Sequence, residues 1–168
     1  NLMGILRYLP NTKLYKNKII DINKDMDIDR DDFINKLFDL GYEKKPVVSR
    51  TGEMAIRGYV IDIFPIEFDN PIRIEFWGDT IDSIKYFDLD DQISNTSVDS
   101  VKIYPYTEFL IDGKIGDNII RKQKYLLNYS DSVSGLWDYV SDSVIFYYDY
   151  NQIINSYSLL RENILEYD

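Results

Sequence analysis

The segment 72–87 constrains the fold of this chain more than any other part of its sequence. Apolar residues alternate with polar or amphipathic ones over 72–77, and a second alternating run covers 80–87. Such alternation is typical of a β-strand with one buried face. Only Gly78-Asp79 separates the two runs, and a two-residue loop with glycine is typical of a tight hairpin. The sequence therefore predicts two antiparallel strands in a sheet with one apolar face.

The second face of strand 72–77 is the first candidate for a functional surface. Alternation places Arg73, Glu75 and Trp77 on this face together. Tryptophan and arginine are enriched at the energetic centres of protein interfaces, so the trio is a candidate binding surface. A structural alternative is equally open on the pattern alone: Trp77 packs under a helix, and Arg73 pairs with Glu75 or with another carboxylate.

Composition limits the class of protein. The chain has 168 residues, of which 45% are apolar and 15% aromatic, so we expect a folded protein. No apolar stretch approaches the roughly 20 residues that a membrane span needs, and we expect no membrane contact. The N-terminus has neither an initiator Met nor a signal peptide, so we expect a piece of a longer protein. The absence of cysteine fits a cytoplasmic protein.

The residue types that are absent exclude several kinds of chemistry. The chain has no Cys and no His, which excludes thiolate nucleophiles, Ser-His-Asp triads, disulfides and the usual zinc sites. Its net charge of −10 argues against a nucleic-acid footprint over the whole surface and favours a protein partner. The acidic bend 21–32 imitates a calcium loop, but Met26 stands where that loop needs Gly. We expect no catalytic residue, cofactor or metal in this chain.

The remaining pattern predicts an α+β fold, mainly an antiparallel sheet domain with helices. A helix is expected near 33–40, capped by Asp29 or Asp31 and ended by Gly41. Strands are expected at Val47-Val48, 54–64, 72–77, 80–87, 101–104 and 144–148, and further helices at 119–127, 136–140 and 152–165. The final strand and helix are typical of an α/β unit rather than of the antiparallel middle.

About residues 37–150 resemble one family, the UvrB-homology region that transcription-repair coupling factors share with the excision-repair protein UvrB. The resemblance is carried by these motifs: Gly52-Glu53-Met54-Ala55-Ile56-Arg57-Gly58, Ile61-Asp62-Ile63-Phe64-Pro65, Arg73-Ile74-Glu75-Phe76-Trp77-Gly78-Asp79 and Ile81-Asp82-Ser83-Ile84. The sequences of 59–65 and 82–88 are more similar to those of the coupling factors, known as Mfd, than to that of UvrB.

The resemblance implies a docking surface for the repair protein UvrA. It places the contact arginines at Arg57 and Arg73 and an aromatic contact at Trp77, where relatives usually carry Phe; Glu75 is an additional candidate. It also implies three parts: 1–13 as the end of a first helicase-like segment, 14–110 as the UvrA-binding module, and 111–168 as a returning, degenerate helicase-like α/β segment.

The parent protein, by the same resemblance, is an ATP-dependent DNA translocase that uses Mg, binds double-stranded DNA and displaces stalled RNA polymerase. One alternative is a fragment of UvrB, which verifies damage. That protein is expected to carry Glu after the strand aspartate, whereas Tyr150 follows Asp149 in this sequence. A second alternative is an enzyme that uses a carboxylate pair from Asp62, Glu75, Asp79 and Asp82.

Overall fold

The computed structural model describes residues 2–113, 122–140 and 142–165, and it has an α+β fold. The helices are α1 (Leu2–Leu6), α2 (Thr12–Lys18), α3 (Arg30–Asp39), α4 (Leu136–Tyr139) and α5 (Tyr150–Leu165), with a 3₁₀ helix η1 (Gln123–Asn128). The strands are β1 (Leu9–Pro10), β2 (Ile20–Asn23), β3 (Glu43–Lys44), β4 (Glu53–Arg57), β5 (Val60–Ile63), β6 (Ile72–Trp77), β7 (Thr80–Phe87), β8 (Ser94–Val98), β9 (Ser100–Ile103) and β10 (Val133–Ser134).

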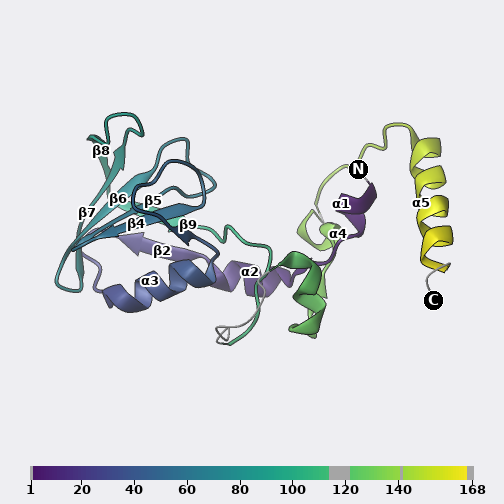
Figure 1. Cartoon of the computed structure of the whole chain (residues 1–168), viewed down its shortest axis with the longest axis horizontal. Helices are drawn as coiled ribbons and strands as arrows, with labels where there is room; N and C mark the ends of the chain where they lie inside the picture. The colour runs from purple at the N-terminus through teal and green to yellow at the C-terminus, as the bar shows by residue number, and fades with distance from the viewer. Residues whose placement is uncertain (1, 114–121, 141, 166–168) are drawn as a thin grey trace.

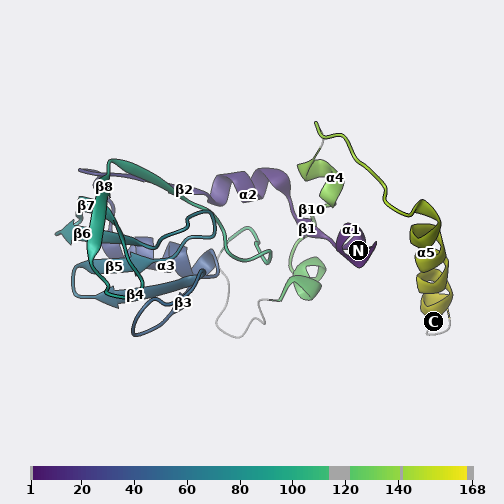
Figure 2. The same cartoon turned by 90° about the horizontal axis from the view of Figure 1, so that it is seen from above.

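Six of the strands form one sheet in the order β3-β4-β5-β6-β7-β8. Only the β3–β4 pair is parallel among these described strands, and every other neighbour is antiparallel. Two smaller antiparallel pairs, β2–β9 and β1–β10, lie outside this sheet. The six-stranded sheet lies at one end of the molecule and α5 at the other, as both views show (Figures 1 and 2).

The β6–β7 hairpin has the predicted boundaries. Trp77 pairs with Thr80 across the turn, and Gly78 adopts a φ of +62°, a conformation that glycine reaches without steric strain. A bulge interrupts the register between Glu75 and Phe76, because Asp82 is an extra residue on the β7 side. Since the extra residue is in β7, side chains along β6 keep their alternation.

One face of the six-stranded sheet is covered by α3 and by the β2–β9 pair. The Asp29 side chain caps α3 by accepting a 2.7 Å hydrogen bond from the Asp32 N–H, and Gly41 (φ +92°) ends it, as predicted. Phe33 and Leu37 of α3 pack on the sheet. The buried residues of this core also include Ile22, Leu40, Tyr42, Met54, Ile61, Ile63, Ile72, Ile74, Phe76, Ile81, Ile84, Val101 and Ile103.

The opposite face of the sheet, which we call the outer face, has a different character. A smaller apolar cluster of Val48, Ala55, Phe64 and Phe87 covers part of it. The middle of this face carries charged side chains instead. The registers align Asp62 of β5 with Arg73 of β6, and Arg73 with Lys85 of β7.

Two strand predictions in the sheet region were wrong, and β3 and β8 were not predicted. The predicted strand 54–64 is two strands, β4 and β5, because Gly58 (φ +57°) turns the chain between them. Val47-Val48 is not a strand, and the neighbouring Glu43–Lys44 forms β3 instead. The sequence reading also missed β8, whose residues are mostly polar and whose pairing with β7 depends on backbone hydrogen bonds.

Outside the six-stranded sheet, the outcomes are mixed. The predicted 101–104 strand corresponds to β9, and α4 and α5 are helical close to the predicted 136–140 and 152–165. The predicted helix 119–127 lies partly outside the described residues, and the described part is η1. The apolar run 144–148 has no regular secondary structure and pairs with no described strand, so the predicted strand was wrong.

The segment that precedes the sheet region contacts the segment that follows it. Strand β1 pairs with β10, with Leu9 opposite Ser134, and the Tyr139 hydroxyl donates a 2.8 Å hydrogen bond to the Pro10 carbonyl. A third buried cluster of Phe109, Ile111 and Leu126 lies in the same part of the chain. None of the described helices combines the length and apolar character that crossing a bilayer requires.

Candidate functional site

Strand β6 presents the predicted trio on the outer face. Ile72, Ile74 and Phe76 are buried in the core below the sheet, so the intervening side chains point to the other side. Arg73 and Glu75 are partly exposed there, and Trp77 is exposed. The alternation that predicted a shared face is therefore confirmed.

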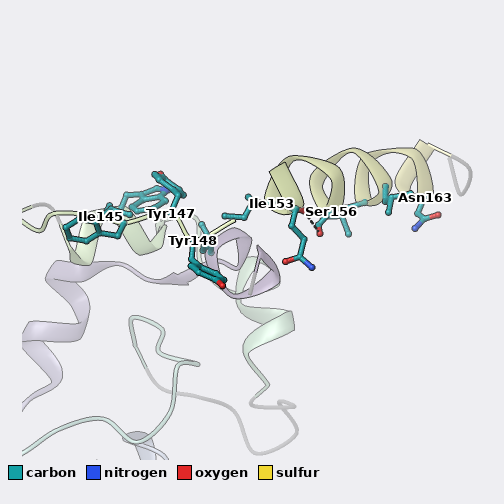
Figure 3. A pocket seen from close by; sticks show the side chains of 12 residues that line it. Ile145, Tyr147, Tyr148, Ile153, Ser156 and Asn163 are labelled. Carbon is teal, nitrogen blue, oxygen red and sulfur yellow. Dashed lines mark hydrogen bonds between the residues drawn. The ribbon is translucent and has the colours of Figure 1, made fainter. Parts of the chain in front are cut away.

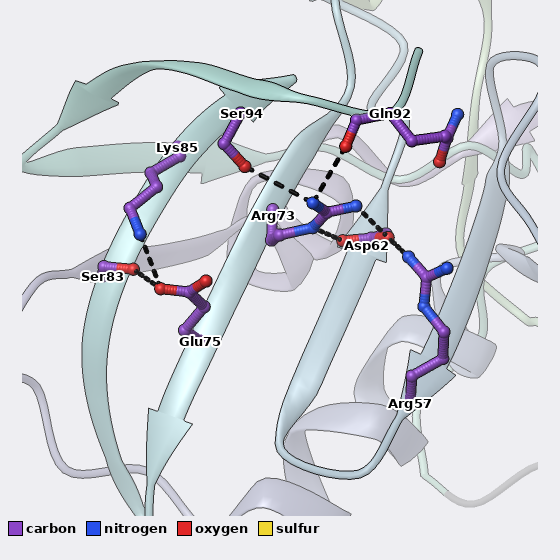
Figure 4. A network of polar contacts seen from close by, with 8 residues as sticks. All are labelled: Arg57, Asp62, Arg73, Glu75, Ser83, Lys85, Gln92 and Ser94. Carbon is purple, nitrogen blue, oxygen red and sulfur yellow. Dashed lines mark hydrogen bonds and ion pairs between the residues drawn. The ribbon is translucent and has the colours of Figure 1, made fainter. Parts of the chain in front are cut away.

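A buried carboxylate joins two arginines at the centre of this face (Figure 4). Asp62 of β5 is 1% exposed, and both of its oxygens are bonded. Arg73 donates from Nε to Asp62 Oδ1 at 2.8 Å and from Nη2 to Oδ2 at 3.0 Å. Arg57, at the end of β4, donates from Nη2 to the same Oδ2. The three side chains form an Arg57–Asp62–Arg73 cluster that spans three neighbouring strands.

The Arg73 guanidinium is held from several sides. Its Nη1 donates to the Gln92 carbonyl at 3.1 Å and, more weakly, to Ser94 Oγ at 3.4 Å. The guanidinium carbon lies 4.6 Å from the centre of the Phe87 ring, which adds a cation–π contact. The hydrogen bonds to Asp62 raise the pKa of Arg73 above its ordinary value. The side chain is only 16% exposed, so its polar atoms are largely occupied within the chain.

Arg57 differs from Arg73 in its exposure. Its side chain is 46% exposed, and its one ion pair in the described part of the chain is with Asp62. A guanidinium has five N–H groups in a planar fork, so most of the donors of Arg57 remain available to another molecule. Arg57 is therefore the arginine of this face that can form a bidentate contact with an external carboxylate.

Glu75 has its own partners on the outer face. Lys85 Nζ lies 2.7 Å from Glu75 Oε2, and the Ser83 hydroxyl also donates to that oxygen. The hydrogen bonds from Lys85 and Ser83 lower the pKa of Glu75. A general acid needs a raised pKa, so the environment of Glu75 is opposite to the one that acid catalysis requires. Among the described residues, no group of three or more acidic side chains is arranged to hold a metal ion.

Trp77 projects from the end of the sheet. Its side chain is 81% exposed, so the alternative that it packs under a helix is wrong. The other half of that alternative, that Arg73 pairs with Glu75 or with another carboxylate, is confirmed, and the carboxylate is that of Asp62.

Tyr59 is an exposed aromatic residue that the sequence analysis missed. It lies in the β4–β5 turn and is 66% exposed. Its carbonyl accepts a 2.9 Å hydrogen bond from the Phe76 N–H, so this turn lies beside the strand end that carries Trp77. Gly58 could have indicated a turn that exposes Tyr59, but the sequence analysis placed both residues inside one continuous strand.

A shallow pocket of about 360 Å³ lies on the outer face between these groups. It is lined by Arg57, Val60, Arg73, Glu75 and Gln92. Gln92 has a φ of +62°, and its Nε2 donates to the Leu89 carbonyl at 2.8 Å. Within the described residues, its Oε1 is buried without a hydrogen-bond partner. The pocket thus has cationic and anionic side chains around the apolar Val60.

The comparisons with known proteins agree on one family. The family described as the UvrB interaction domain matches residues 20–109, more than half of the chain. A transcription-repair-coupling factor of Staphylococcus aureus (strain bovine RF122 / ET3-1) is 37% identical over 114 residues, which cover 68% of this chain and 10% of that protein.

Two further relatives carry the same name. The transcription-repair-coupling factor of Staphylococcus haemolyticus is 38% identical over 110 residues, covering 66% of this chain and 9% of the relative. That of Staphylococcus epidermidis (strain ATCC 35984) is 33% identical over 129 residues, covering 77% and 11%. The chain thus spans about a tenth of the length of the relatives it matches. The chain belongs to the UvrB interaction domain family, and within it resembles the transcription-repair-coupling factors.

Proposed function

We propose that the outer face of the sheet is the surface by which a transcription-repair coupling factor recruits UvrA for nucleotide excision repair. The observation that carries this proposal is the exposure of Trp77 on the same face as the half-exposed Arg57. Because the Trp77 side chain is 81% exposed, it gains little stability from burial. Exposed apolar residues beside polar groups are characteristic of protein interaction sites.

The chemistry of this face fits a partner surface that carries carboxylates. Although the chain as a whole has a net charge of −10, the outer face carries the cations Arg57, Arg73 and Lys85 against the anions Asp62 and Glu75. Arg57 supplies charge-assisted hydrogen bonds to an external carboxylate, and Trp77 supplies buried apolar area. Arg73 and Glu75 complete the proposed UvrA-binding set and line the pocket between them.

The role of the parent protein is part of the same proposal. Its relatives are named for coupling transcription to repair, and the chain spans only a tenth of their length. We infer a bacterial, cytoplasmic, ATP-dependent DNA translocase that binds double-stranded DNA and displaces stalled RNA polymerase, with ATP and Mg bound outside these residues. This chain contributes protein recognition rather than catalysis.

The three-part division of the chain also remains a proposal, with 14–110 as the interaction module. The pairing of β1 with β10 supports a single unit made from 1–13 and 111–168, because it joins residues on both sides of the module. The Tyr139–Pro10 hydrogen bond supports the same division.

Calorimetric titration of UvrA with the 168-residue chain tests the proposed function. Trp77→Ala is expected to weaken binding by about 2–4 kcal/mol, and Arg57→Ala by about 1–3 kcal/mol, with little change in melting temperature. Arg73→Ala is less informative, because it also removes the main partner of the buried Asp62 carboxylate.

Two matched controls separate the surface from general effects of truncation. Trp137→Ala removes the second tryptophan of the chain, on α4, and Arg161→Ala removes an exposed arginine of α5. Both variants are expected to bind UvrA as tightly as the unmodified chain. Unchanged affinity of the Trp77 and Arg57 variants, or an equal loss in the controls, would reject the proposed surface.

A further inference from the structure

Asp62 is an unusual residue for the middle of a strand. Its neighbours Ile61 and Ile63 are fully buried in the core, and Asp62 itself is 1% exposed on the outer face. A buried carboxylate is unfavourable unless cations and hydrogen-bond donors replace the water that it loses. Arg73 and Arg57 together supply those donors. An apolar residue at position 62 would avoid this cost, as Ile61 and Ile63 do at the other buried sites of β5. We therefore look for a functional reason for the ionic cluster.

The cluster is asymmetric in a way that suggests this explanation. Arg73 binds both oxygens of Asp62 and also contacts the Gln92 carbonyl and the Phe87 ring, so this side of the cluster is fixed. Arg57 is bound at one nitrogen only and remains half exposed. Asp62 therefore connects a fixed arginine to one whose remaining donors are accessible.

We propose that Asp62 is a positioning residue for partner binding: anchored by Arg73, it holds Arg57 in the orientation in which its remaining N–H groups bind a carboxylate of the partner. This inference rests on the proposed function, which assigns the outer face to UvrA. Arg57 stands at the end of β4 next to the Gly58 turn, and a long side chain in such a place samples many rotamers when nothing holds it. Fixing it before binding lowers the conformational entropy lost in the complex.

A simple charge argument predicts the opposite effect of removing the Asp62 charge on partner binding, so the direction of the change in affinity distinguishes the two explanations. Asp62 neutralises part of the positive charge of the two arginines. Replacing it by a neutral residue makes the face more cationic and, by long-range attraction alone, should tighten binding to an acidic partner. If Asp62 positions Arg57, the same replacement weakens binding, because the arginine loses its fixed orientation.

The experiment is a double-mutant cycle with Asp62→Asn, which keeps the shape of the side chain and removes its charge. In the 168-residue chain we expect Asp62→Asn to weaken UvrA binding roughly five- to tenfold by calorimetry. In an Arg57→Ala background the same change should alter affinity less than about twofold, since there is no side chain left to position. In a Trp77→Ala background the full loss should persist, because Trp77 is not part of the cluster.

Three outcomes distinguish this inference from the proposed function. Equal or tighter binding by Asp62→Asn, while Arg57→Ala weakens binding, overturns the positioning role alone. An equal loss in the wild-type and Arg57→Ala backgrounds also overturns it, because it indicates a general structural effect. Unchanged binding by both Arg57→Ala and Trp77→Ala rejects the docking surface itself.

A second measurement does not depend on whether Asp62→Asn folds. Nitrogen-15 NMR of arginine side chains in the unmodified chain reports rotation about the Nε–Cζ bond, which an ion pair slows. We expect slow rotation for Arg57 and Arg73 and fast rotation for Arg161, the exposed arginine of α5. Rotation of Arg57 as fast as that of Arg161 would show that Asp62 does not hold it, and the inference would be wrong.

Discussion

The six-stranded sheet with α3 and the C-terminal segment 142–165 use similar residues with very different results. In the sheet, aromatic and β-branched side chains such as Phe33 and Ile74 are fully buried. In the C-terminal segment, Phe146 is 90% and Tyr148 95% exposed, although the run 144–148 is as apolar as any strand of the sheet. The comparison teaches that apolar composition favours a strand only where a neighbouring strand satisfies its backbone and a second layer covers its side chains.

The exposed run lines a hollow of about 710 Å³ together with Trp137 and residues of α5 (Figure 3). Ile145 and Tyr147 are less exposed than Phe146 and Tyr148, but all four residues line the hollow. Trp77 is exposed in a different setting, because its strand is paired on both sides and its neighbour Phe76 is buried. Exposure of an apolar side chain therefore supports a binding role for Trp77 more directly than for Phe146.

The largest expected difference between the two regions concerns stability. Phe33→Ala removes a fully buried ring of α3 that contacts Phe76, and we expect the free energy of unfolding to fall by about 3–5 kcal/mol. Phe146→Ala removes an exposed ring and should change it by less than about 0.5 kcal/mol. Urea unfolding followed by circular dichroism measures both. A Phe146→Ala loss as large as that of Phe33→Ala would contradict the contrast between the regions.

A second prediction uses pH. Burial alone would raise the pKa of Glu53, but hydrogen bonds from Ser49 and Arg50 outweigh it and hold the pKa below its ordinary value of 4.5. Because the folded state prefers the ionised form, this stabilisation is complete above the ordinary pKa and is lost as the pH falls through the lower folded value.

The measurement is the free energy of unfolding of the wild type and of Glu53→Gln between pH 7 and pH 3. We expect Glu53→Gln to lose about 1–3 kcal/mol at pH 7, since it weakens several hydrogen bonds to a charged group. The difference between the two proteins should shrink below pH 4.5, where Glu53 becomes protonated in the unfolded chain while it is still ionised in the folded one. A constant difference over the whole range would mean that the Glu53 carboxylate does not contribute through its charge.

A third prediction compares two glycines. Gly78 has a φ of +62° in the β6–β7 turn and open space where a Cβ would stand, so Gly78→Ala should cost about 1–2 kcal/mol from backbone strain alone. Gly4 of α1 also has open space and has no such φ, and Gly4→Ala should leave stability unchanged or slightly raised because alanine favours a helix. Thermal unfolding of the two variants provides the comparison. Equal effects would indicate that the turn relaxes to accept a side chain.

The same contrast explains how much of the fold could be predicted from the sequence. The β6–β7 hairpin and α3 were predictable because their signals are local: a glycine turn between alternating runs, and an aspartate cap with a closing glycine. Strand 144–148 was mispredicted because a strand depends on partners that lie elsewhere in the chain. Strand β8 was missed for the converse reason, since polar residues form a strand when β7 offers backbone partners.

The candidate site shows the same division between local and distant information. Alternation along β6 placed Arg73, Glu75 and Trp77 on one face without knowledge of any other strand. The pairing of Arg73 with Asp62 could not be predicted in that way, because it depends on the register between β5 and β6. The loop between these strands sets that register, and its length alone does not determine which residues face each other.

The smallest expected effect tests whether the sheet region depends on the C-terminal segment. Helix α5 lies far from the six-stranded sheet in both views, and its neighbours are α1 and the residues that line the hollow (Figures 1 and 2). Deleting residues from 142 onward therefore removes no contact from the core around α3. We expect the free energy of unfolding to change by less than about 0.5 kcal/mol and UvrA affinity to stay the same. A loss of more than about 1 kcal/mol in urea unfolding would show that the segment supports the sheet, and the exposed apolar run would then need an explanation within this chain.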